Sequence, residues 1–441
     1  MIPLSGLVAV GVYWRTLAPS ITWAHWGGDG GDFVTSAVTG RLPHPPGFPL
    51  YFLASRGVVR LIGGDPARAL NVLSALSAGG SVSLTAATLR RRGLPWPVQL
   101  SSALTLGFAP WLWSQAVITE VYACGALFAS AVVFVAGTDE GLGRWRSLLA
   151  GLVVGCAAAV HPTLLLLGAY VLFLYRPSIP LFGLGALLGL VPYALLPLQG
   201  PWPQPWGDLS SFSGWLDYVT AQVYWGNAFG LPARYWPERI LAFVSLGSRQ
   251  FTPVGAVVVG LGFWASWRLG RGRTAALLGI LGVVSLYAIG YNSADSWVYL
   301  VGYLPVVVLM LAEGWRWVVD QGVSSTLSLL LPVALLALNW RQMDLHNDQE
   351  AAVWLESMLR QLPSSATVLS EEDRHTMTLW YGTDGLGRRP DLVIVDRRLW
   401  WYTPYRQTVS QRASISVERP EELAVGGPLC EITDDGEVRC L

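Results

Sequence analysis

The sequence predicts an α-helical polytopic membrane protein with a small α/β domain at its C-terminal end. Of its 441 residues, 52% are hydrophobic and only 13% are charged, whereas soluble globular proteins carry about 25% charged residues. Several charge-free runs are long enough to cross a bilayer, which takes about 20 apolar residues in a helix. After residue 340 the pattern changes to short β-branched runs between polar turns. The net charge is zero, so nothing indicates a nucleic-acid partner.

The predicted transmembrane domain occupies residues 1–340 and contains about eleven spans. Residues 147–175 form one long apolar run that His161 and Pro162 interrupt. Because proline breaks the hydrogen bonding of a helix, we expect two short helices on either side of this pair. The other apolar runs of suitable length are residues 3–14, 69–89, 93–119, 121–138, 177–198, 251–267, 274–294, 296–312 and 321–340.

The distribution of arginine predicts which side of the membrane each loop faces. Arginine and lysine gather in the short cytoplasmic loops of membrane proteins. With the N-terminus in the cytoplasm, the first outer loop is 19–65, the second large outer loop is 199–250, and residues 341–441 form an extracytoplasmic domain. The arginines that support this orientation lie at residues 90–92, 144–146, 176, 268–273 and 316.

The C-terminal domain is predicted to be a small α/β unit. Residues 366–369 and 392–395 are β-branched runs typical of strands, and residues 371–381 between them predict a turn and a helix. Cys430 and Cys440 bracket an acidic tail, and their spacing fits no zinc site. An oxidising compartment would allow them to form a disulfide, but the sequence leaves their pairing open.

The first outer loop carries two carboxylates three residues apart, Asp29 and Asp32, among several glycines. If Asp29 begins a helix, Asp32 lies one turn further along on the same face. The glycines permit close approach of a ligand. The alternative is structural, because an aspartate before a helix often accepts hydrogen bonds from the first backbone N–H groups. From the residues alone, capping is favoured over catalysis.

His44 follows in the same loop, within a segment that contains four prolines between residues 43 and 49. Prolines fix the backbone and can hold a side chain still, although a plain connector into a helix is the alternative. Residues 50–61 place Arg56 and Arg60 at helical spacing. We expect this stretch to form an amphipathic helix along the membrane surface.

Three ionisable residues lie at the predicted outer ends of spans, namely Glu120, His161 and Asp295. Ionisable groups at such a depth are costly and therefore often functional, but paired structural groups occur in the same places. Both interpretations stay open, and for Glu120 and His161 they are equally favoured. The sequence contains no cluster of residues with the spacing of metal ligands. We therefore expect that the protein requires no metal ion.

Four passages together resemble a known family. Residues 29–33 read Asp-Gly-Gly-Asp-Phe, and residues 44–51 read His-Pro-Pro-Gly-Phe-Pro-Leu-Tyr. Residues 71–76 begin with Asn-Val-Leu-Ser, and residues 113–122 contain Trp-Ser-Gln-Ala followed by Glu-Val-Tyr. This set resembles a large family of polytopic membrane proteins that includes the transmembrane protein O-mannosyltransferases. The chain departs from the family pattern at Gly30, where a hydroxyl residue is usual, and at Asp32, where glutamate is usual.

The resemblance implies a GT-C-type glycosyltransferase with a GT-C-like helical fold. Such enzymes take a sugar, here a mannose-like one, from a polyprenyl-phosphate carrier on the outer side of the membrane. Their catalytic carboxylate lies in the first outer loop, and Asp29 occupies the matching position. Asp29 is then the general base for the acceptor hydroxyl, and Asp32 positions the acceptor or Asp29. The expected acceptor is a protein, glycan or lipid. We expect no cofactor besides the lipid-linked sugar, which is the donor substrate. The expected location of the enzyme is a bacterial plasma membrane.

The remaining candidate residues are expected to bind the substrates. A lipid phosphate that leaves with negative charge needs cationic or hydrogen-bonding partners. His44, Arg56 and Arg60 are candidates for that role from their location. The candidates for the rest of the substrate pocket are Tyr51, Glu120, Tyr122 and His161.

Two other functions are compatible with the same residues. A transporter or flippase of a lipid-linked sugar would use a similar polar pocket without chemistry, and the break at His161 resembles the broken helices of transporters. A non-catalytic scaffold would have no use for Asp29 or for the rigid segment around His44. Whether the sugar leaves its carrier lipid distinguishes these functions.

Overall fold

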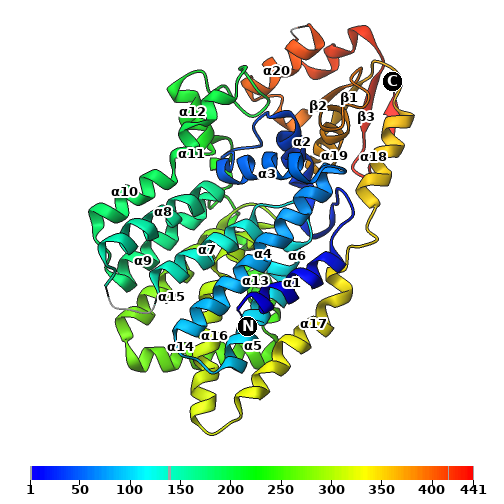
Figure 1. Cartoon of the computed structure of the whole chain (residues 1–441). Coiled ribbons are helices and arrows are strands. Elements are labelled where there is room, and N and C mark those ends of the chain that lie inside the picture. The colour runs from blue at the N-terminus through cyan, green and yellow to red at the C-terminus, as the bar shows by residue number, and fades with distance from the viewer. Residues whose placement is uncertain (1, 138–140, 416, 441) are drawn as a thin grey trace.

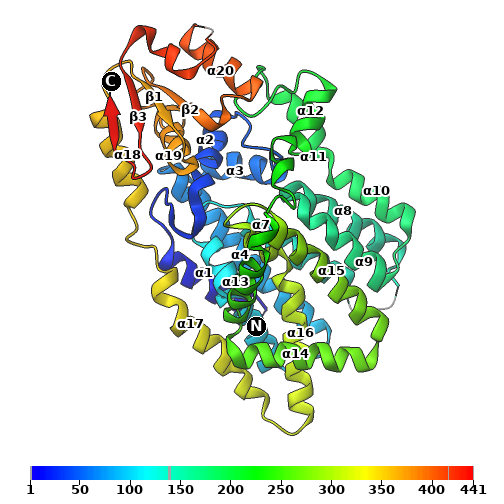
Figure 2. The same ribbon diagram turned by 180° about the vertical axis from the view of Figure 1, so that it is seen from behind.

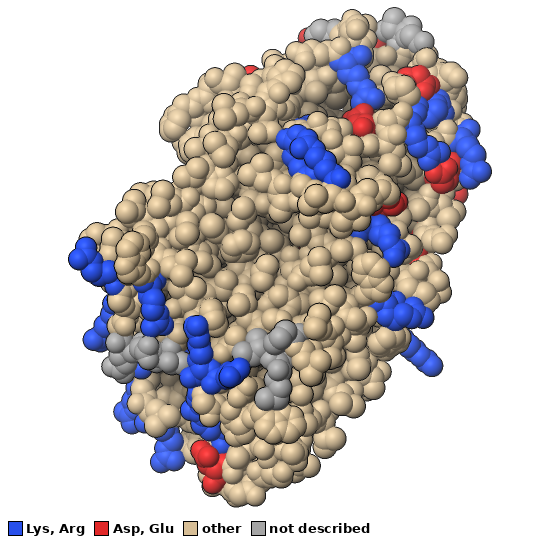
Figure 3. Space-filling model, in the orientation of Figure 1, with Lys and Arg blue, Asp and Glu red and all other residues tan. Residues whose placement is uncertain are grey.

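A computed structural model describes residues 2–137, 141–415 and 417–440 of the chain. Most helices form one bundle, and the C-terminal segment forms a separate unit at one end of it (Figure 1, Figure 2). On the face drawn in Figure 3, charged side chains gather near the C-terminal unit and near the opposite end, with a largely uncharged surface between them. The helices of the bundle are α1 (Ile2–Thr16), α4 (Pro66–Arg91), α5 (Trp96–Phe108), α6 (Pro110–Ala116), α7 (Tyr122–Ala136), α8 (Arg144–Val160), α9 (Leu167–Tyr175), α10 (Ile179–Gly189), α11 (Val191–Ala194), α13 (Trp236–Arg249), α14 (Thr252–Leu269), α15 (Arg271–Gly290), α16 (Leu304–Asp320) and α17 (Leu330–Met343).

Three helices in the described part of the chain are long and apolar enough to cross a membrane. They are α4, α15 and the continuous helix Ser296–Asp320, which contains α16. All three coincide with predicted spans. The apolar helices α7 and α10 are shorter, and Thr138, the last residue of the span predicted over 121–138, lies outside the described residues. The expected number of about eleven spans stays a prediction.

Prolines lie at the breaks in three of the predicted spans. The run 177–198 divides into α10, α11 and a 3₁₀ helix (Leu196–Gln199), and Pro192 and Pro197 lie in the first turns of the last two. The break expected at His161 is confirmed, because α8 ends at Val160 and a 3₁₀ helix (Pro162–Leu166) precedes α9. The single span expected over 93–119 is wrong. It divides into α5 and α6 at Pro110, whose ring cannot continue the backbone hydrogen bonding of a helix but fits its first turn.

The C-terminal unit is the small α/β structure that the sequence predicts. Its four-stranded sheet has the order β2-β1-β3-β4, in which β1 runs parallel to β2 and β3 and antiparallel pairing joins β3 to β4. A disulfide joins Cys430 to Cys440 across that antiparallel pair. The elements are α18 (Glu350–Gln361), β1 (Thr367–Ser370), α19 (Asp373–Trp380), β2 (Val393–Asp396), α20 (Thr403–Ala413), β3 (Leu429–Ile432) and β4 (Val438–Cys440).

The first outer loop lies between the bundle and the C-terminal unit (Figure 1). It contains a 3₁₀ helix (Ala24–Asp29), α2 (Gly30–Thr39) and α3 (Pro49–Ile62), and α3 confirms the helix expected over 50–61. The first turn of α2 packs tightly on α19, because a Cβ atom at Gly31 would lie only 2.2 Å from the carbonyl oxygen of Met377. The glycine here allows close approach of a second helix rather than of a ligand. From the predicted second outer loop (199–250), α12 (Phe212–Val219) lies at the same end of the bundle as the C-terminal unit (Figure 1).

Candidate active site

Asp29 lies where the first loop turns into α2. It is the last residue of the 3₁₀ helix and occupies the N-cap position of α2, but its side chain makes no capping hydrogen bond. The capping interpretation is therefore wrong, and the carboxylate is available to a ligand. The side chain is 40% exposed and lines two cavities, of about 710 and 530 Å³. Asp29 thus faces two spaces that can each hold a small substrate group.

The surroundings of Asp29 make its carboxylate a stronger base than an ordinary aspartate. Burial raises the pKa of Asp29 to about 6; His44 opposes this rise, while Asp373, Asp295 and Asp32 add to it by charge repulsion. A carboxyl group with this pKa is still mostly ionised at neutral pH, and it accepts a proton more readily than a group with a pKa near 4. These properties suit a general base.

Asp32 is completely buried and holds His44 in place. One carboxylate oxygen accepts from the backbone N–H of His44 at 2.7 Å and from its Nδ1 at 3.0 Å, while the other accepts from Trp206 Nε1 at 3.0 Å. Burial alone would raise the pKa of Asp32, but the hydrogen bonds from His44 and the charge of Arg41 hold that pKa below its ordinary value. Asp32 therefore stays ionised behind the cavity wall and is connected to Asp29 through His44.

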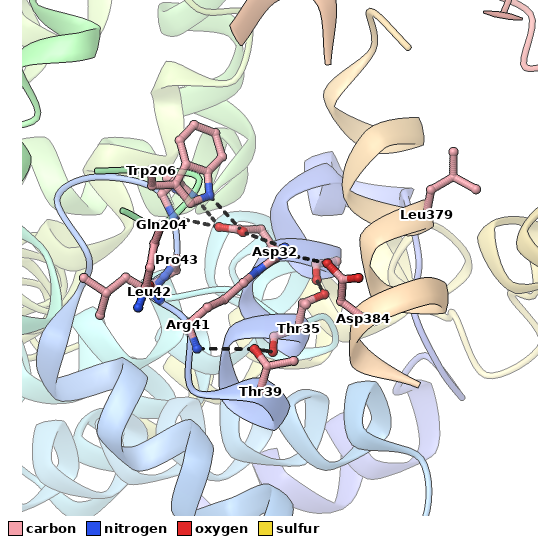
Figure 4. A network of polar contacts seen from close by, with 12 residues as sticks. Asp32, Thr35, Thr39, Arg41, Leu42, Pro43, Gln204, Trp206, Leu379 and Asp384 are labelled. Carbon is pink, nitrogen blue, oxygen red and sulfur yellow. Dashed lines mark hydrogen bonds and ion pairs between the residues drawn. The ribbon is translucent and has the colours of Figure 1, made fainter. Parts of the chain in front are cut away.

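A polar network around Asp32 ties the first loop to two distant parts of the chain (Figure 4). The backbone N–H of Leu42 donates to Gln204 in the second outer loop at 2.7 Å. Arg41 donates to Asp384 of the C-terminal unit at 2.8 Å. Because each partner comes from a different segment, the network fixes the position of the loop that carries His44.

His44 lies between the two carboxylates of the first loop. Its Nδ1 faces Asp32, and its Nε2 is 3.7 Å from Asp29 Oδ2. The rings of Phe33 and Phe48 pack at 5.0 and 5.2 Å from the imidazole. Burial would lower the pKa of His44, but Asp29 and Asp32 together raise it above the ordinary value. The two carboxylates therefore stabilise the charged form of the imidazole.

Four predicted site residues line the same larger cavity, namely Asp29, His44, Tyr122 and His161. The ring of His161 lies 5.5 Å from that of Tyr122, and its Nδ1 is 2.8 Å from the hydroxyl of Thr163. Sequence reasoning thus selected four side chains from three separate segments that the fold brings together around one space.

The other predicted binding residues lie outside the lining of this cavity. Arg56 donates to Gln199 at 2.8 Å instead, and Arg60 is exposed on α3. Tyr51 and Glu120 are buried in the structure behind the cavity. The roles expected for these four residues in substrate binding stay predictions.

The C-terminal unit supplies a wall of the larger cavity that the sequence analysis missed. Asp373, Asp396 and Arg398 all line it. Asp396 ends β2, and Asp373 lies three residues after the end of β1. Ligands in open α/β structures bind beyond the carboxyl ends of parallel strands. That rule, applied to the two predicted strands, is the signal that could have found these residues.

The carboxylates of this wall, Asp373 and Asp396, have raised pKa values, as Asp29 does. Burial raises the pKa of Asp396 to about 6, against the opposing charge of Arg398 and with an addition from Asp373. Burial also raises the pKa of Asp373, again opposed first by Arg398. Arg398 pairs with Asp373 and lies 3.9 Å from Asp396. The far wall of the cavity therefore combines one guanidinium with two carboxylates.

No group of three or more His, Cys, Asp and Glu side chains is arranged to hold a metal ion in the part of the chain that the structure describes. The expectation that neither a metal nor a further cofactor is required stays a prediction.

Comparison with known proteins agrees with the resemblance seen in the sequence. Residues 29–178 match the family model of the protein O-mannosyl-transferase TMEM260 N-terminal domain. The match begins at Asp29 and confirms the expected family likeness. Protein O-mannosyl-transferase TMEM260 of Mus musculus is 24% identical over 458 residues, which cover 91% of this chain and 64% of the mouse protein. The chain thus spans just under two thirds of the length of this TMEM260 relative.

The fold is also found in a solved structure. The crystal structure of ArnT from Cupriavidus metallidurans, bound to undecaprenyl phosphate, superposes with a TM-score of 0.65. The superposition covers 98% of this chain and 93% of that chain at 13% sequence identity. The chain therefore has the fold of ArnT, which confirms the largely helical architecture that the sequence predicts.

Proposed function

We propose that this chain is a membrane glycosyltransferase that moves a mannose-like sugar from a polyprenyl-phosphate carrier to a hydroxyl acceptor. The observation that carries the proposal is the position of Asp29, whose carboxylate has a raised pKa and lines both cavities. A group-transfer enzyme with two substrates needs a base where the two meet. The names of the relatives support this choice, since one is an O-mannosyl-transferase and the other binds a polyprenyl phosphate.

Asp29 is the proposed general base. The acceptor oxygen attacks the anomeric carbon of the sugar as its proton passes to the Asp29 carboxylate. The bond between that carbon and the phosphate oxygen breaks, and the carrier leaves as polyprenyl phosphate with the bonding electron pair. A single displacement of this kind inverts the anomeric configuration.

His44 and Arg398 are the proposed partners of the leaving phosphate. Of the described residues that line the larger cavity, Arg398 carries a permanent positive charge, and Asp29 and Asp32 stabilise the charged form of His44. Charge placed in advance beside the leaving oxygen stabilises the negative charge that develops there. This assignment replaces Arg56 and Arg60, which lie outside the cavity lining. Tyr122 and His161 remain the proposed aromatic contacts of the sugar.

Asp32 is proposed as a positioning residue rather than a catalytic one. Its two hydrogen bonds to His44 orient the imidazole so that Nε2 faces Asp29 and the cavity. The proposed acceptor, a protein, glycan or lipid, would approach through the smaller cavity. An extracytoplasmic site in a bacterial plasma membrane is part of the same proposal.

A transfer assay tests the function directly. Purified protein in liposomes would receive radiolabelled polyprenyl-phosphate mannose, then the glucose and arabinose carriers, with membrane extract as the source of acceptor. We expect label to leave one carrier with wild-type protein and with Asp217→Asn, an exposed aspartate on α12. Asp29→Asn should abolish the transfer. Label that stays on every carrier but crosses the bilayer would indicate a flippase instead.

A further inference from the structure

A second polar cavity lies at the end of the bundle opposite the C-terminal unit. It has a volume of about 440 Å³ and is formed where the end of α4 meets α9, α14, α15 and α16. These helix ends occupy the lower part of Figure 1, and arginine side chains gather over the same part of the surface in Figure 3. The cavity shares no lining residue with the two cavities beside Asp29.

The polar part of this cavity is strongly basic. Its described lining contains Arg91, Arg92, Arg273 and Arg316, and Glu313 is the carboxylate among them. Glu313 lies 3.4 Å from Arg92 and 3.3 Å from Arg316. A single carboxylate between two guanidinium groups leaves an excess of positive charge that a bound anion would neutralise.

Arg92 carries this positive charge into a partly enclosed place. Its side chain is 19% exposed, and one terminal nitrogen donates to the Tyr175 hydroxyl at 3.4 Å. Its Nε is buried and donates to no acceptor among the described residues. Buried donors of charged groups are normally satisfied, because leaving them unpaired is costly. Arginines that serve only to orient a protein in the membrane can stay exposed, as Arg144 and Arg271 do here.

The rest of the cavity is apolar and reaches the surface of the bundle. Leu174, Leu277, Val306 and Leu309 line it. Leu277, Val306 and Leu309 lie within the predicted spans 274–294 and 296–312. A free anion needs no apolar wall, whereas a lipid has an acyl chain that fits beside one. The two parts of the cavity together match an amphiphile with a negatively charged head.

We propose that this cavity binds the phosphate head group of an anionic membrane lipid. The phosphate lies beside Arg92 and Arg316, and an acyl chain follows the apolar wall formed by Leu277, Val306 and Leu309. Basic pockets between membrane helices are suited to lipid head groups in this way. The site is independent of sugar transfer, so its test does not depend on the proposed function.

Binding can be measured with the purified full-length protein in detergent. Native mass spectrometry would count the lipids retained, and thermal unfolding would be followed with added phosphatidylglycerol, phosphatidylcholine of the same chain length, or inorganic phosphate. We expect retention and stabilisation with phosphatidylglycerol, and much less with the other two. Equal effects of the two lipids would overturn the proposal. Equal stabilisation by inorganic phosphate would mean that the site takes free phosphate rather than lipid.

Three variants separate the cavity from general surface charge. Arg316→Gln should weaken phosphatidylglycerol binding about fivefold, the effect of one basic residue near a lipid phosphate. Glu313→Gln removes the competing carboxylate and should strengthen binding by a similar factor. Arg271→Gln is the matched control, since this exposed arginine lies on α15 but outside the cavity lining. An equal loss with Arg271→Gln, or no gain with Glu313→Gln, would refute the assignment.

Discussion

The packing of α2 on α19 allows a quantitative test of how the C-terminal unit closes the candidate site. A Cβ atom at Gly31 would lie 2.2 Å from the carbonyl oxygen and 2.4 Å from the carbonyl carbon of Met377. These are backbone atoms, so the contact cannot be relieved by rotation of a side chain. Gly31→Ala therefore requires α2 and α19 to move apart by about 1 Å, in a region packed without spare volume.

The expected cost follows from two opposing effects. Overpacking of this kind destabilises a protein by about 1–3 kcal/mol, and alanine in place of glycine within a helix returns up to about 1 kcal/mol. We expect Gly31→Ala to lose about 1 kcal/mol of stability, which is the middle of the overpacking range less the gain from alanine. Gly30→Ala is the matched control on the same helix turn, because its added Cβ would lie 3.6 Å from Thr119, an ordinary contact. That variant should be neutral or slightly more stable.

Two measurements on the purified protein in detergent check this prediction. Thermal unfolding followed by tryptophan fluorescence should give a lower midpoint for Gly31→Ala than for Gly30→Ala or wild type. Limited proteolysis of the connection between α17 and α18, residues 344–349, should be faster in Gly31→Ala because the C-terminal unit opens more often. Equal midpoints and equal cleavage rates for the two variants would refute the close packing of α2 on α19.

Three further outcomes are expected from the site and the tail. Because the base must be ionised, the transfer rate should fall as the pH drops through about 6, the pKa of Asp29, which a pH profile measures; a fall only below pH 4 would contradict the raised pKa. Asp29 and Asp32 both raise the pKa of His44, and Asp32→Asn removes the second of these charges, so peptide-level carbethoxylation of His44 should begin at a lower pH than in wild type. Reduction of the Cys430–Cys440 disulfide should destabilise the C-terminal unit by about 3 kcal/mol, which is the cost of opening a loop of this size. Denaturant unfolding of the protein with and without reductant measures this loss.

The architecture was predictable wherever a local pattern decides it. The run over 69–89 became α4, and the break at His161 follows from the chemistry of Pro162. The division of residues 93–119 at Pro110 follows from the same chemistry, but hydropathy alone hides it because both halves are apolar. The sequence analysis did not predict strands β3 and β4, because charged residues interrupt their short apolar runs. They are stabilised by pairing, β3 with β1 and β4 with β3.

The candidate site was predictable on the bundle side and not beyond it. Asp29 and His44 lie in short motifs whose glycines and prolines mark an unusual backbone, and both line the cavity. Helical spacing placed Arg56 on one face of α3, but spacing cannot say which face meets the cavity. Asp373 and Arg398 come from segments more than 340 residues after Asp29. Only the tertiary docking of the C-terminal unit brings them to the site.

The strength of Asp29 as a base therefore depends on contacts that no single motif contains. Its pKa rises through burial, and Asp373 on α19 and Asp295, just before the helix Ser296–Tyr303, add to the rise. If the docking of α19 on α2 loosens, burial and the charge of Asp373 both decrease around Asp29. Gly31→Ala should therefore move the low-pH limit of transfer from about 6 toward the ordinary aspartate value of about 4. Gly30→Ala should leave it unchanged. An unchanged limit in Gly31→Ala, together with a looser C-terminal unit, would mean that the bundle alone sets the pKa of Asp29.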